Sequence, residues 1–263
     1  MGIGIMQGRL LPPEDNRIQA FPRNRWQEEF ALAAEAGLQC IEWIYDLYGA
    51  DVNPIASDEG IRTIRRLADE HCVAVNSLCA DYFMDRPELD PRKLIWLFER
   101  CRFAGISRLV LPFVDASRIL DSAHAERVVT MLREVLPDVQ LNRVEIHLET
   151  SLDPRSFADL LDALPNPLFR VNYDSGNSAS LGYSPVEEFA AYGERIGSIH
   201  IKDRMLHGAS VPLGTGSADF ATIIRELKKI SYRGDFVLQA ARETSGGEVA
   251  LARRNASWLL SQL

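Results

Sequence analysis

The sequence lacks the features that mark membrane and secreted proteins. No window approaches the roughly 18 consecutive apolar residues of a membrane span. The first residues, MGIGIMQGRL, contain no basic segment followed by an apolar one, so no signal peptide is evident. The few cysteines form no CxxC pair, which disfavours a cysteine zinc site or a thioredoxin-type motif. We therefore expect a cytoplasmic protein whose thiols are reduced and buried.

An excess of basic residues is also missing. The chain has 29 Lys and Arg against 37 Asp and Glu, a formal net charge of −8. General nucleic-acid binding needs clustered cations, so it is disfavoured. A composition of 46% hydrophobic and 25% charged residues is typical of a globular protein. From the length of 263 residues we expect a single domain over residues 1–263.

Short apolar runs alternate with longer amphipathic segments from end to end. Most runs are apolar without strict alternation, as expected for strands that are buried on both faces. The intervening segments repeat apolar residues at helical spacing, as Trp26, Phe30 and Ala33 do before Gly37. The expected strands span residues 2–6, 40–44, 73–77, 108–112, 144–149, 169–174, 198–203 and 236–239.

Three expected helices begin with a capping residue followed by proline. These pairs are 90–91 and 153–154, both Asp-Pro, and 184–185, Ser-Pro. The capping side chain can accept from free backbone N–H groups, and proline at the first helical position has no N–H to leave unpaired. These signals support helices after the third, fifth and sixth strands.

Eight strand–helix units in this length predict an α/β fold, a (β/α)₈ TIM barrel. A doubly wound open sheet is the alternative. No GxGxxG follows the first strand, which weakens the dinucleotide-binding form of that alternative. The two longest connections, residues 7–24 and 203–217, both begin where a strand ends. Long loops at that edge usually cover an active site.

The last four expected strands end in polar residues, Glu149, Asp174, His200 and Gln239. Catalytic groups of a TIM barrel come from these strand ends, so the four side chains should converge. Each residue alone is more often a surface, turn or core residue, and His147 keeps the core interpretation. Their coincidence on four consecutive strands predicts a site for one divalent metal ion, Mn²⁺, Mg²⁺, Co²⁺ or Zn²⁺.

Several motifs resemble the xylose isomerase-like TIM barrels. They are Glu149, Asp174-Ser-Gly-Asn177, His200-Ile-Lys-Asp203 and Pro212-Leu-Gly-Thr-Gly216, and the resemblance covers essentially the whole chain. That superfamily holds sugar and sugar-phosphate isomerases and epimerases, inosose dehydratases and endonuclease IV. The resemblance implies a metal-dependent isomerase or epimerase of a sugar, sugar phosphate or sugar acid. Its reaction would pass through a metal-stabilised enediolate, with Glu149 as the base.

Gln239 departs from the family pattern. The family's epimerases hold the metal with Glu, Asp, His and a second Glu, and Gln239 takes the place of the second Glu. A glutamine oxygen can ligate a metal, but the amide cannot transfer a proton at neutral pH. The substitution therefore favours isomerisation, or another reaction with a single base, over two-base epimerisation. An epimerase would need a substitute acid, for which Asp203 and Asp81 are the candidates.

The resemblance also implies a small-molecule sugar substrate near these strand ends. Basic residues suited to an anionic tail are Arg9, Lys202, Arg204 and Arg242; further candidates for substrate contacts are Gln7, Glu42, Asp81, Asn177 and Asp203. Dehydration or carbon–carbon cleavage through the same enolate, and a non-catalytic sugar-binding barrel, remain alternatives. An apurinic endonuclease is disfavoured by the missing histidines and the negative charge. Homo-oligomers are common in the family, which leaves such an assembly open.

Overall fold

A computed structural model describes residues 2–84, 89–243 and 247–263. Its central strands are short and almost entirely buried, because aliphatic residues face both the barrel interior and the surrounding helices. Their bounds are β1 Ile3–Met6, β2 Cys40–Ile44, β3 Ala74–Cys79, β4 Arg108–Phe113, β5 Glu145–Thr150, β6 Phe169–Asp174, β7 Ile196–Ile201 and β10 Phe236–Leu238.

These strands close into a parallel barrel, in the order β1-β10-β7-β6-β5-β4-β3-β2. The first and last strands of the chain pair with each other, with Ile3 opposite Phe236 and Ile5 opposite Leu238. Closure leaves no strand edge exposed. The (β/α)₈ prediction is confirmed, and the open-sheet alternative is wrong because its terminal strands would remain unpaired.

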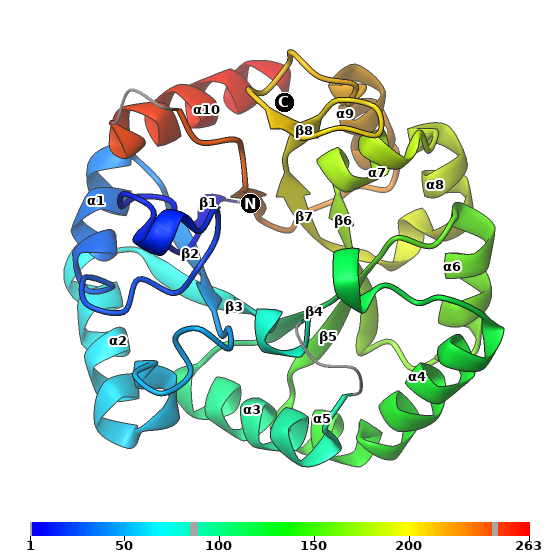
Figure 1. Cartoon of the computed structure of the whole chain (residues 1–263), viewed down its shortest axis with the longest axis horizontal. Coiled ribbons are helices and arrows are strands. Elements are labelled where there is room, and N and C mark those ends of the chain that lie inside the picture. The colour runs from blue at the N-terminus through cyan, green and yellow to red at the C-terminus, as the bar shows by residue number, and fades with distance from the viewer. Residues whose placement is uncertain (1, 85–88, 244–246) are drawn as a thin grey trace.

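Helices surround the barrel as an outer ring (Figure 1). The last helix, α10, lies beside α1 and completes the ring. The helix bounds are α1 Glu28–Ala36, α2 Asp58–His71, α3 Pro91–Ala104, α4 Ser122–Glu134, α5 Leu136–Asn142, α6 Pro154–Asp162, α7 Ser175–Leu181, α8 Pro185–Tyr192, α9 Phe220–Lys229 and α10 Glu248–Gln262. None of the helices in the described ranges is long and apolar enough to cross a bilayer.

Two of the three expected helix caps form as predicted. Asp90 accepts from the backbone N–H groups of Arg92 and Lys93, and Asp153 caps α6 in the same way. The Ser184 side chain makes no capping hydrogen bond, although α8 begins at Pro185 as expected. Proline at the first position is thus sufficient here to mark the start of the helix.

The seventh strand differs from the prediction. It runs from Ile196 to Ile201, whereas residues 198–203 were expected. Asp203 and Arg204 instead form β8, which pairs antiparallel with β9, Ser210–Val211, in a separate hairpin above the barrel end. The apolar run of the seventh strand therefore continues into a loop that has a sheet of its own.

The cysteines are free, but not all of them are buried. Cys40, Cys79 and Cys101 are buried, whereas Cys72 is exposed. Cys72 caps the end of α2 in the left-handed conformation with φ +54°, at a turn that leads from the surface into β3. The expectation of uniformly buried thiols is corrected at this position.

Candidate metal and substrate site

A cavity of about 620 Å³, here called the upper cavity, opens at the carboxyl ends of the strands. Strand-end residues converge there because parallel strands bring all their carboxyl ends to one face of the barrel. The predicted site residues that line the upper cavity are Arg9, Asp81, Glu149, Asn177, His200, Lys202, Arg204, Gln239 and Arg242.

Glu149, Asp174 and His200 form a compact cluster at the base of this cavity. One ligand atom from each of them lies within 4.8 Å of the others, and all three residues are buried. They stand on the adjacent strands β5, β6 and β7, where Asp174 is directly opposite His200 in the β6–β7 register. The fold thus brings together three of the four predicted metal ligands.

Two atoms of the cluster are open toward a cation. Asp174 Oδ1 accepts from the N–H groups of Gly176 and Asn177 at the start of α7. Asp174 Oδ2 and His200 Nδ1 are buried and make no hydrogen bond among the described residues, although Lys202 Nζ lies 3.6 Å from Oδ2 and Glu149 Oε2 lies 3.2 Å from Nδ1. Buried polar atoms normally have partners, so these two fit the open coordination of a metal site. Carboxylate oxygens and an imidazole nitrogen suit Mn²⁺, Mg²⁺, Co²⁺ or Zn²⁺.

Glu42 contacts the ring nitrogen of His200 that faces away from Glu149 and Asp174. Its Oε1 lies 2.7 Å from His200 Nε2, and both side chains are almost fully buried. Burial alone would raise the pKa of Glu42, but the neighbouring His200 holds that pKa below its usual value. With Nε2 donating to Glu42, Nδ1 faces Glu149 and Asp174. This is the carboxylate–histidine arrangement that orients metal-ligating imidazoles.

We expect Glu42→Gln to weaken binding of Mn²⁺ by about 10- to 100-fold, the usual effect of losing such an orienting carboxylate. The amide keeps the volume of the side chain but accepts a hydrogen bond less strongly than the carboxylate. Isothermal titration calorimetry with Mn²⁺ gives the affinity, and thermal unfolding tests whether the fold is retained. An unchanged affinity would show that Glu42 has no orienting role.

Both oxygens of Glu149 accept hydrogen bonds from amides. Asn172 Nδ2 lies 2.8 Å from Oε2, and Asn177 Nδ2 lies 2.8 Å from Oε1. Asn177 in turn accepts from Arg204 through its Oδ1 at 3.0 Å. The carboxylate also lies 3.2 Å from His200 Nδ1. Glu149 is therefore held in one orientation at the cavity wall.

Gln239 lines the upper cavity but is hydrogen-bonded to other side chains. Its Oε1 accepts from Lys202 Nζ at 3.3 Å, and its Nε2 donates to Gln19 at 2.8 Å. Lys202 Nζ also lies 3.6 Å from Asp174 Oδ2. The glutamine oxygen thus faces a lysine ammonium, and its role as a fourth ligand stays a prediction.

Gln19 connects several side chains of the upper cavity. It donates to Asp81 Oδ2 at 2.7 Å and accepts from Arg9 and Gln239. Burial raises the pKa of Asp81, an effect that hydrogen bonds from Cys79 and Gln19 oppose. Asp81 is therefore a carboxyl group of the cavity lining with an increased tendency to stay protonated.

Arg9 and Arg242 differ in how much of their hydrogen-bonding capacity is free. Arg9 is 8% exposed, and burial followed by the neighbouring Arg242 lowers its pKa to about 10. Its Nε is buried without a partner among the described residues. Arg242 instead donates to the backbone carbonyls of Gly8, Leu11 and Ile18. Arg9 also donates from Nη1 to the Ala240 carbonyl at 2.9 Å and from Nη2 to Gln19 at 3.2 Å. Nε is thus its one nitrogen without a partner among the described residues, whereas Arg242 is hydrogen-bonded to the loop that follows β1.

Three predicted substrate contacts lie outside the cavity lining. Gln7 is fully buried and accepts from the Ile44 N–H, which ties β1 to β2. Asp203 is fully buried and accepts from three backbone N–H groups of residues 214–218, which fixes the loop after β9. Glu42 contacts His200, as described above. The sequence motifs identified these residues, but their partners are protein groups in each case.

Sequence reasoning missed Gln19 and the buried pair Asn172 and Ser198. Gln19 lies in an irregular loop with no motif, and only the tertiary fold brings it over Asp81. Asn172 and Ser198 each precede a cluster residue by two positions, and alternate strand residues face the same side. That spacing was the signal that could have placed both of them inside the barrel.

The family model for xylose isomerase-like TIM barrels matches residues 30–262. The chain belongs to this family. Over 103 residues it is 34% identical to a protein of Escherichia coli (strain K12) provisionally named L-ribulose-5-phosphate 3-epimerase SgbU, covering 35% of this chain and 36% of that protein. Inosose dehydratase of Geobacillus kaustophilus (strain HTA426) is 28% identical over 116 residues, 37% of this chain and 38% of the relative. These alignments span little more than a third of the curated relatives.

Solved structures of this xylose isomerase-like family match over the full chain. The IOLI protein with a bound zinc atom has a TM-score of 0.78 at 16% identity, covering 100% of this chain and 98% of that chain. A Mycobacterium smegmatis protein in complex with magnesium has a TM-score of 0.72 at 17% identity, with coverages of 99% and 96%. An L-ribulose 3-epimerase reaches 0.74 at 18% identity, with coverages of 100% and 94%. At these identities the likeness shows the fold.

Proposed function

We propose that this xylose isomerase-like barrel is a divalent-metal-dependent isomerase or epimerase of a sugar phosphate or sugar acid. The observation that carries the proposal is the buried cluster of Glu149, Asp174 and His200, with Asp174 Oδ2 and His200 Nδ1 open. The names of its relatives, a sugar-phosphate epimerase and a dehydratase of a cyclic polyol derivative, support this reaction class. A metal held there would act as a Lewis acid on the carbonyl and hydroxyl oxygens of the substrate.

Glu149 is the proposed base. It lines the upper cavity beside the other ligands, and Asn172 and Asn177 hold both of its oxygens. A fixed carboxylate next to the substrate can remove the proton from the carbon beside the carbonyl and return it. Its orientation is set before the substrate arrives, so little reorganisation accompanies proton transfer.

Arg9 is the proposed partner of the anionic group of the substrate. Its guanidinium is mostly buried, and its Nε donor has no partner among the described residues. Arginine binds phosphate and carboxylate through paired N–H groups. Lys202 and Arg204 add positive charge to the same cavity. The positive charge of Arg9, Lys202 and Arg204 in one cavity favours an anionic substrate.

Two further carboxyl groups, those of Asp203 and Asp81, are candidates for a second proton carrier beside Glu149. Asp203 is excluded as a second proton carrier, because both of its oxygens accept from backbone N–H groups away from the cavity lining. Asp81 lines the cavity, and its raised pKa suits a group that donates a proton. We propose that isomerisation uses Glu149 alone, and that any epimerisation uses Asp81 as its second acid.

Incubation of ketose phosphates in D₂O with Mn²⁺, followed by NMR, tests the reaction. We expect deuterium to enter at C1 or C2 with interconversion of ketose and aldose. Metal analysis after dialysis against Mn²⁺ should find about one equivalent per chain. Failure to bind any of the four metals would refute the site, whereas exchange at C3 with inversion would refute the single-base reaction.

The change Gln239→Glu tests the role of the glutamine. A carboxylate at this position would lie close to Lys202 Nζ, now 3.3 Å from the amide oxygen, and would restore the second acid of the family pattern. We expect tighter Mn²⁺ binding and new deuterium exchange at C3. The conversion Gln239→Ala is the matched comparison, since it removes the oxygen without supplying a proton carrier. Equal behaviour of the two variants would contradict a chemical role for this position.

The same site could perform dehydration, which one of the matched relatives catalyses by its name. Removal of the same proton would then be followed by loss of a hydroxyl group rather than by reprotonation. The D₂O experiment separates the two, because dehydration gives a product lighter by one water. A polyol-derived ketone such as an inosose is the appropriate second substrate.

A further inference from the structure

A continuous chain of polar side chains crosses the barrel interior beneath Glu149. It begins at Glu145, whose Oε2 lies 2.9 Å from His147 Nε2. His147 Nδ1 lies 2.7 Å from Ser198 Oγ, and Ser198 Oγ donates to Asn172 Oδ1 at 2.6 Å. Asn172 Nδ2 then donates to Glu149 Oε2 at 2.8 Å. Four short contacts thus connect the amino ends of the strands to the proposed base.

From His147 to Glu149, the hydrogen bonds between these polar side chains all run in the same direction. Ionised Glu149 only accepts, so Asn172 presents its Nδ2 to Glu149 and its Oδ1 to Ser198. The single hydroxyl hydrogen of Ser198 is therefore used on Asn172 Oδ1. His147 must then donate from Nδ1 to Ser198, because the hydroxyl has no second hydrogen to give. Its Nε2 faces the Glu145 carboxylate, which as an ion only accepts, so both ring nitrogens of His147 are placed to donate. The contact with Ser198 thus favours the same orientation of the Asn172 amide that the contact with Glu149 requires.

Polar residues in this position are costly unless each of them is paired. Barrel interiors are usually filled by Val, Ile and Leu. His147, Asn172 and Ser198 are 0%, 2% and 2% exposed, and none of them lines the upper cavity. Asn172 and Ser198 stand directly opposite each other in the β6–β7 register. A fully connected network of this kind specifies one arrangement of its members.

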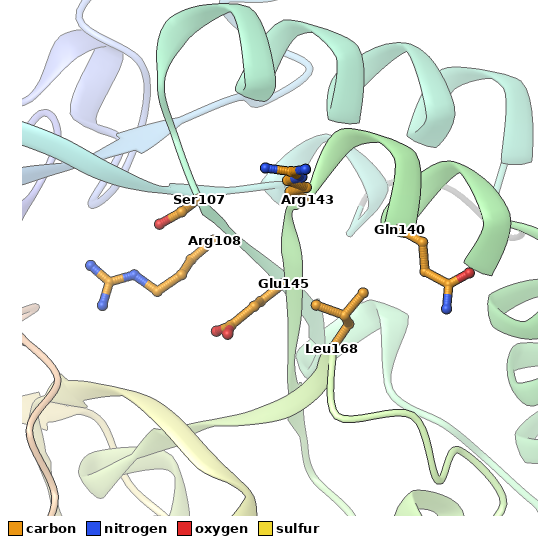
Figure 2. Close-up of a pocket in the computed structure, with 6 residues that line it drawn as sticks. All are labelled: Ser107, Arg108, Gln140, Arg143, Glu145 and Leu168. Carbon is orange, nitrogen blue, oxygen red and sulfur yellow. The ribbon is translucent and has the colours of Figure 1, made fainter.

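The far end of the chain lies at the opposite face of the barrel. Glu145 is 40% exposed at the side chain and lines a second cavity of about 540 Å³, here called the lower cavity. Figure 2 shows Glu145 and Arg108 extending to the same side from the neighbouring strands β5 and β4. Arg108 is paired with Asp235 at 2.7 Å. The chain of polar side chains therefore ends at the amino end of the barrel, on the face opposite the upper cavity.

We propose that His147 and Ser198 are positioning residues for Glu149. They fix the orientation of the Asn172 amide, and the amide holds the Glu149 carboxylate toward Asp174 and His200. This inference rests on the proposed function in so far as Glu149 is a metal ligand and base. Neither residue contacts the metal or the substrate; each acts through Asn172.

Affinity for Mn²⁺ reports the orientation of Glu149 without any substrate. We expect Ser198→Ala to weaken Mn²⁺ binding by about tenfold in calorimetric titration, the lower end of the usual effect for supporting residues. Ser198→Ala removes two buried contacts of the hydroxyl, to His147 and Asn172. The control is Tyr192→Phe, which removes the buried hydrogen bond from Tyr192 to Glu188 at 2.8 Å, away from the cavity. It should lower the midpoint of thermal unfolding similarly while leaving the Mn²⁺ affinity unchanged.

Two substitutions of His147 test the direction of the chain. In His147→Asn the amide nitrogen can take the place of Nδ1 and still donate to Ser198, so most of the wild-type Mn²⁺ affinity should be retained. In His147→Gln the amide lies near the position of Nε2, and the affinity should fall as in Ser198→Ala. Equal Mn²⁺ affinities of the wild type and Ser198→Ala would overturn the positioning role.

Nitrogen-15 NMR of histidine in the metal-free protein decides the same question independently. We expect His147 Nδ1 to carry a proton, and its signal to shift in Ser198→Ala. An unprotonated Nδ1 would overturn the proposal, since Ser198 would then donate to His147 and could not hold Asn172. If the wild type bound no Mn²⁺, the proposed function would fail. The NMR result alone would then test the hydrogen bonds from His147 through Ser198 to Asn172.

Discussion

Glu149→Gln should lower the rate of deuterium exchange into the substrate by about 10²- to 10⁴-fold, the usual contribution of a positioned base. The amide has nearly the volume of the carboxylate, but it cannot accept the proton from carbon. It also presents an N–H₂ group to Asn172 or Asn177, whose amides now donate to the two carboxylate oxygens. We therefore expect weaker Mn²⁺ binding together with the loss of exchange.

The matched control for this change is Glu188→Gln. Glu188 is also a buried glutamate, but its oxygens accept from Ser178, Tyr173 and Tyr192 outside the upper cavity. It should cost stability without reducing the exchange rate at saturating Mn²⁺. Exchange is measured by NMR in D₂O with the ketose phosphate that the wild type converts. Wild-type rates in Glu149→Gln would remove Glu149 from the reaction.

Glu29→Gln should remove a large pH-dependent loss of stability between about pH 5 and pH 8. Glu29 is fully buried on α1 and accepts from the backbone N–H groups of Gly8 and Leu10. Burial raises its pKa from 4.5 to about 8. The folded state therefore keeps a proton that the unfolded state has released, and wild-type stability falls as the pH rises through this interval.

The size of this effect follows from about 1.4 kcal/mol per pKa unit. From about pH 5 to pH 8.5, the free energy of unfolding of Glu29→Gln should rise relative to the wild type by roughly 4 kcal/mol. Urea unfolding at both pH values measures it. The neighbouring exposed Glu28 is the control, because its hydrogen bond to Arg25 lowers its pKa instead. If the difference in free energy of unfolding between Glu29→Gln and the wild type did not change with pH, Glu29 would ionise as it does in water.

Glu29 also bears on the site, because it holds the loop that presents Arg9. Gly8 has φ +82°, and a Cβ there would lie 2.4 Å from the carbonyl oxygen of Ala20. The loop after β1 is thus folded tightly between Glu29, Arg242 and the backbone of residue 20. These contacts hold Arg9 at the edge of the upper cavity.

The periodicity of the sequence was enough to predict the barrel and its strand ends. Buried parallel strands appear as apolar runs, and a polar residue at the end of a run is conspicuous. Glu149, Asp174 and His200 were identified in this way, and Glu149 and His200 line the upper cavity beside Asp174. The boundary of β7 was misplaced because the apolar pattern gives no sign of where a strand becomes a hairpin.

The partners of each polar group could not be predicted from sequence. Glu42 and His200 are 158 residues apart, and Gln19 and Gln239 are 220 apart, yet both pairs are hydrogen-bonded. Asp203 and Arg242 were predicted to contact the substrate, but their side chains are hydrogen-bonded to backbone groups. Such distinctions depend on distances of a few ångströms between strands that only barrel closure sets.

The sequence by itself thus determined the fold class, the family motifs and the chemical types present at the strand ends. Local spacing decides these, because side-chain periodicity and turn chemistry act over a few residues. Only the tertiary structure decided which polar atoms remain open and which are paired. That outcome depends on closure of the ring by β1 and β10, which brings the segments that follow these two strands to one cavity. Asp174 Oδ2 makes no hydrogen bond, whereas Asp203 accepts hydrogen bonds from backbone N–H groups. The two aspartates differ in the groups that the fold places beside them.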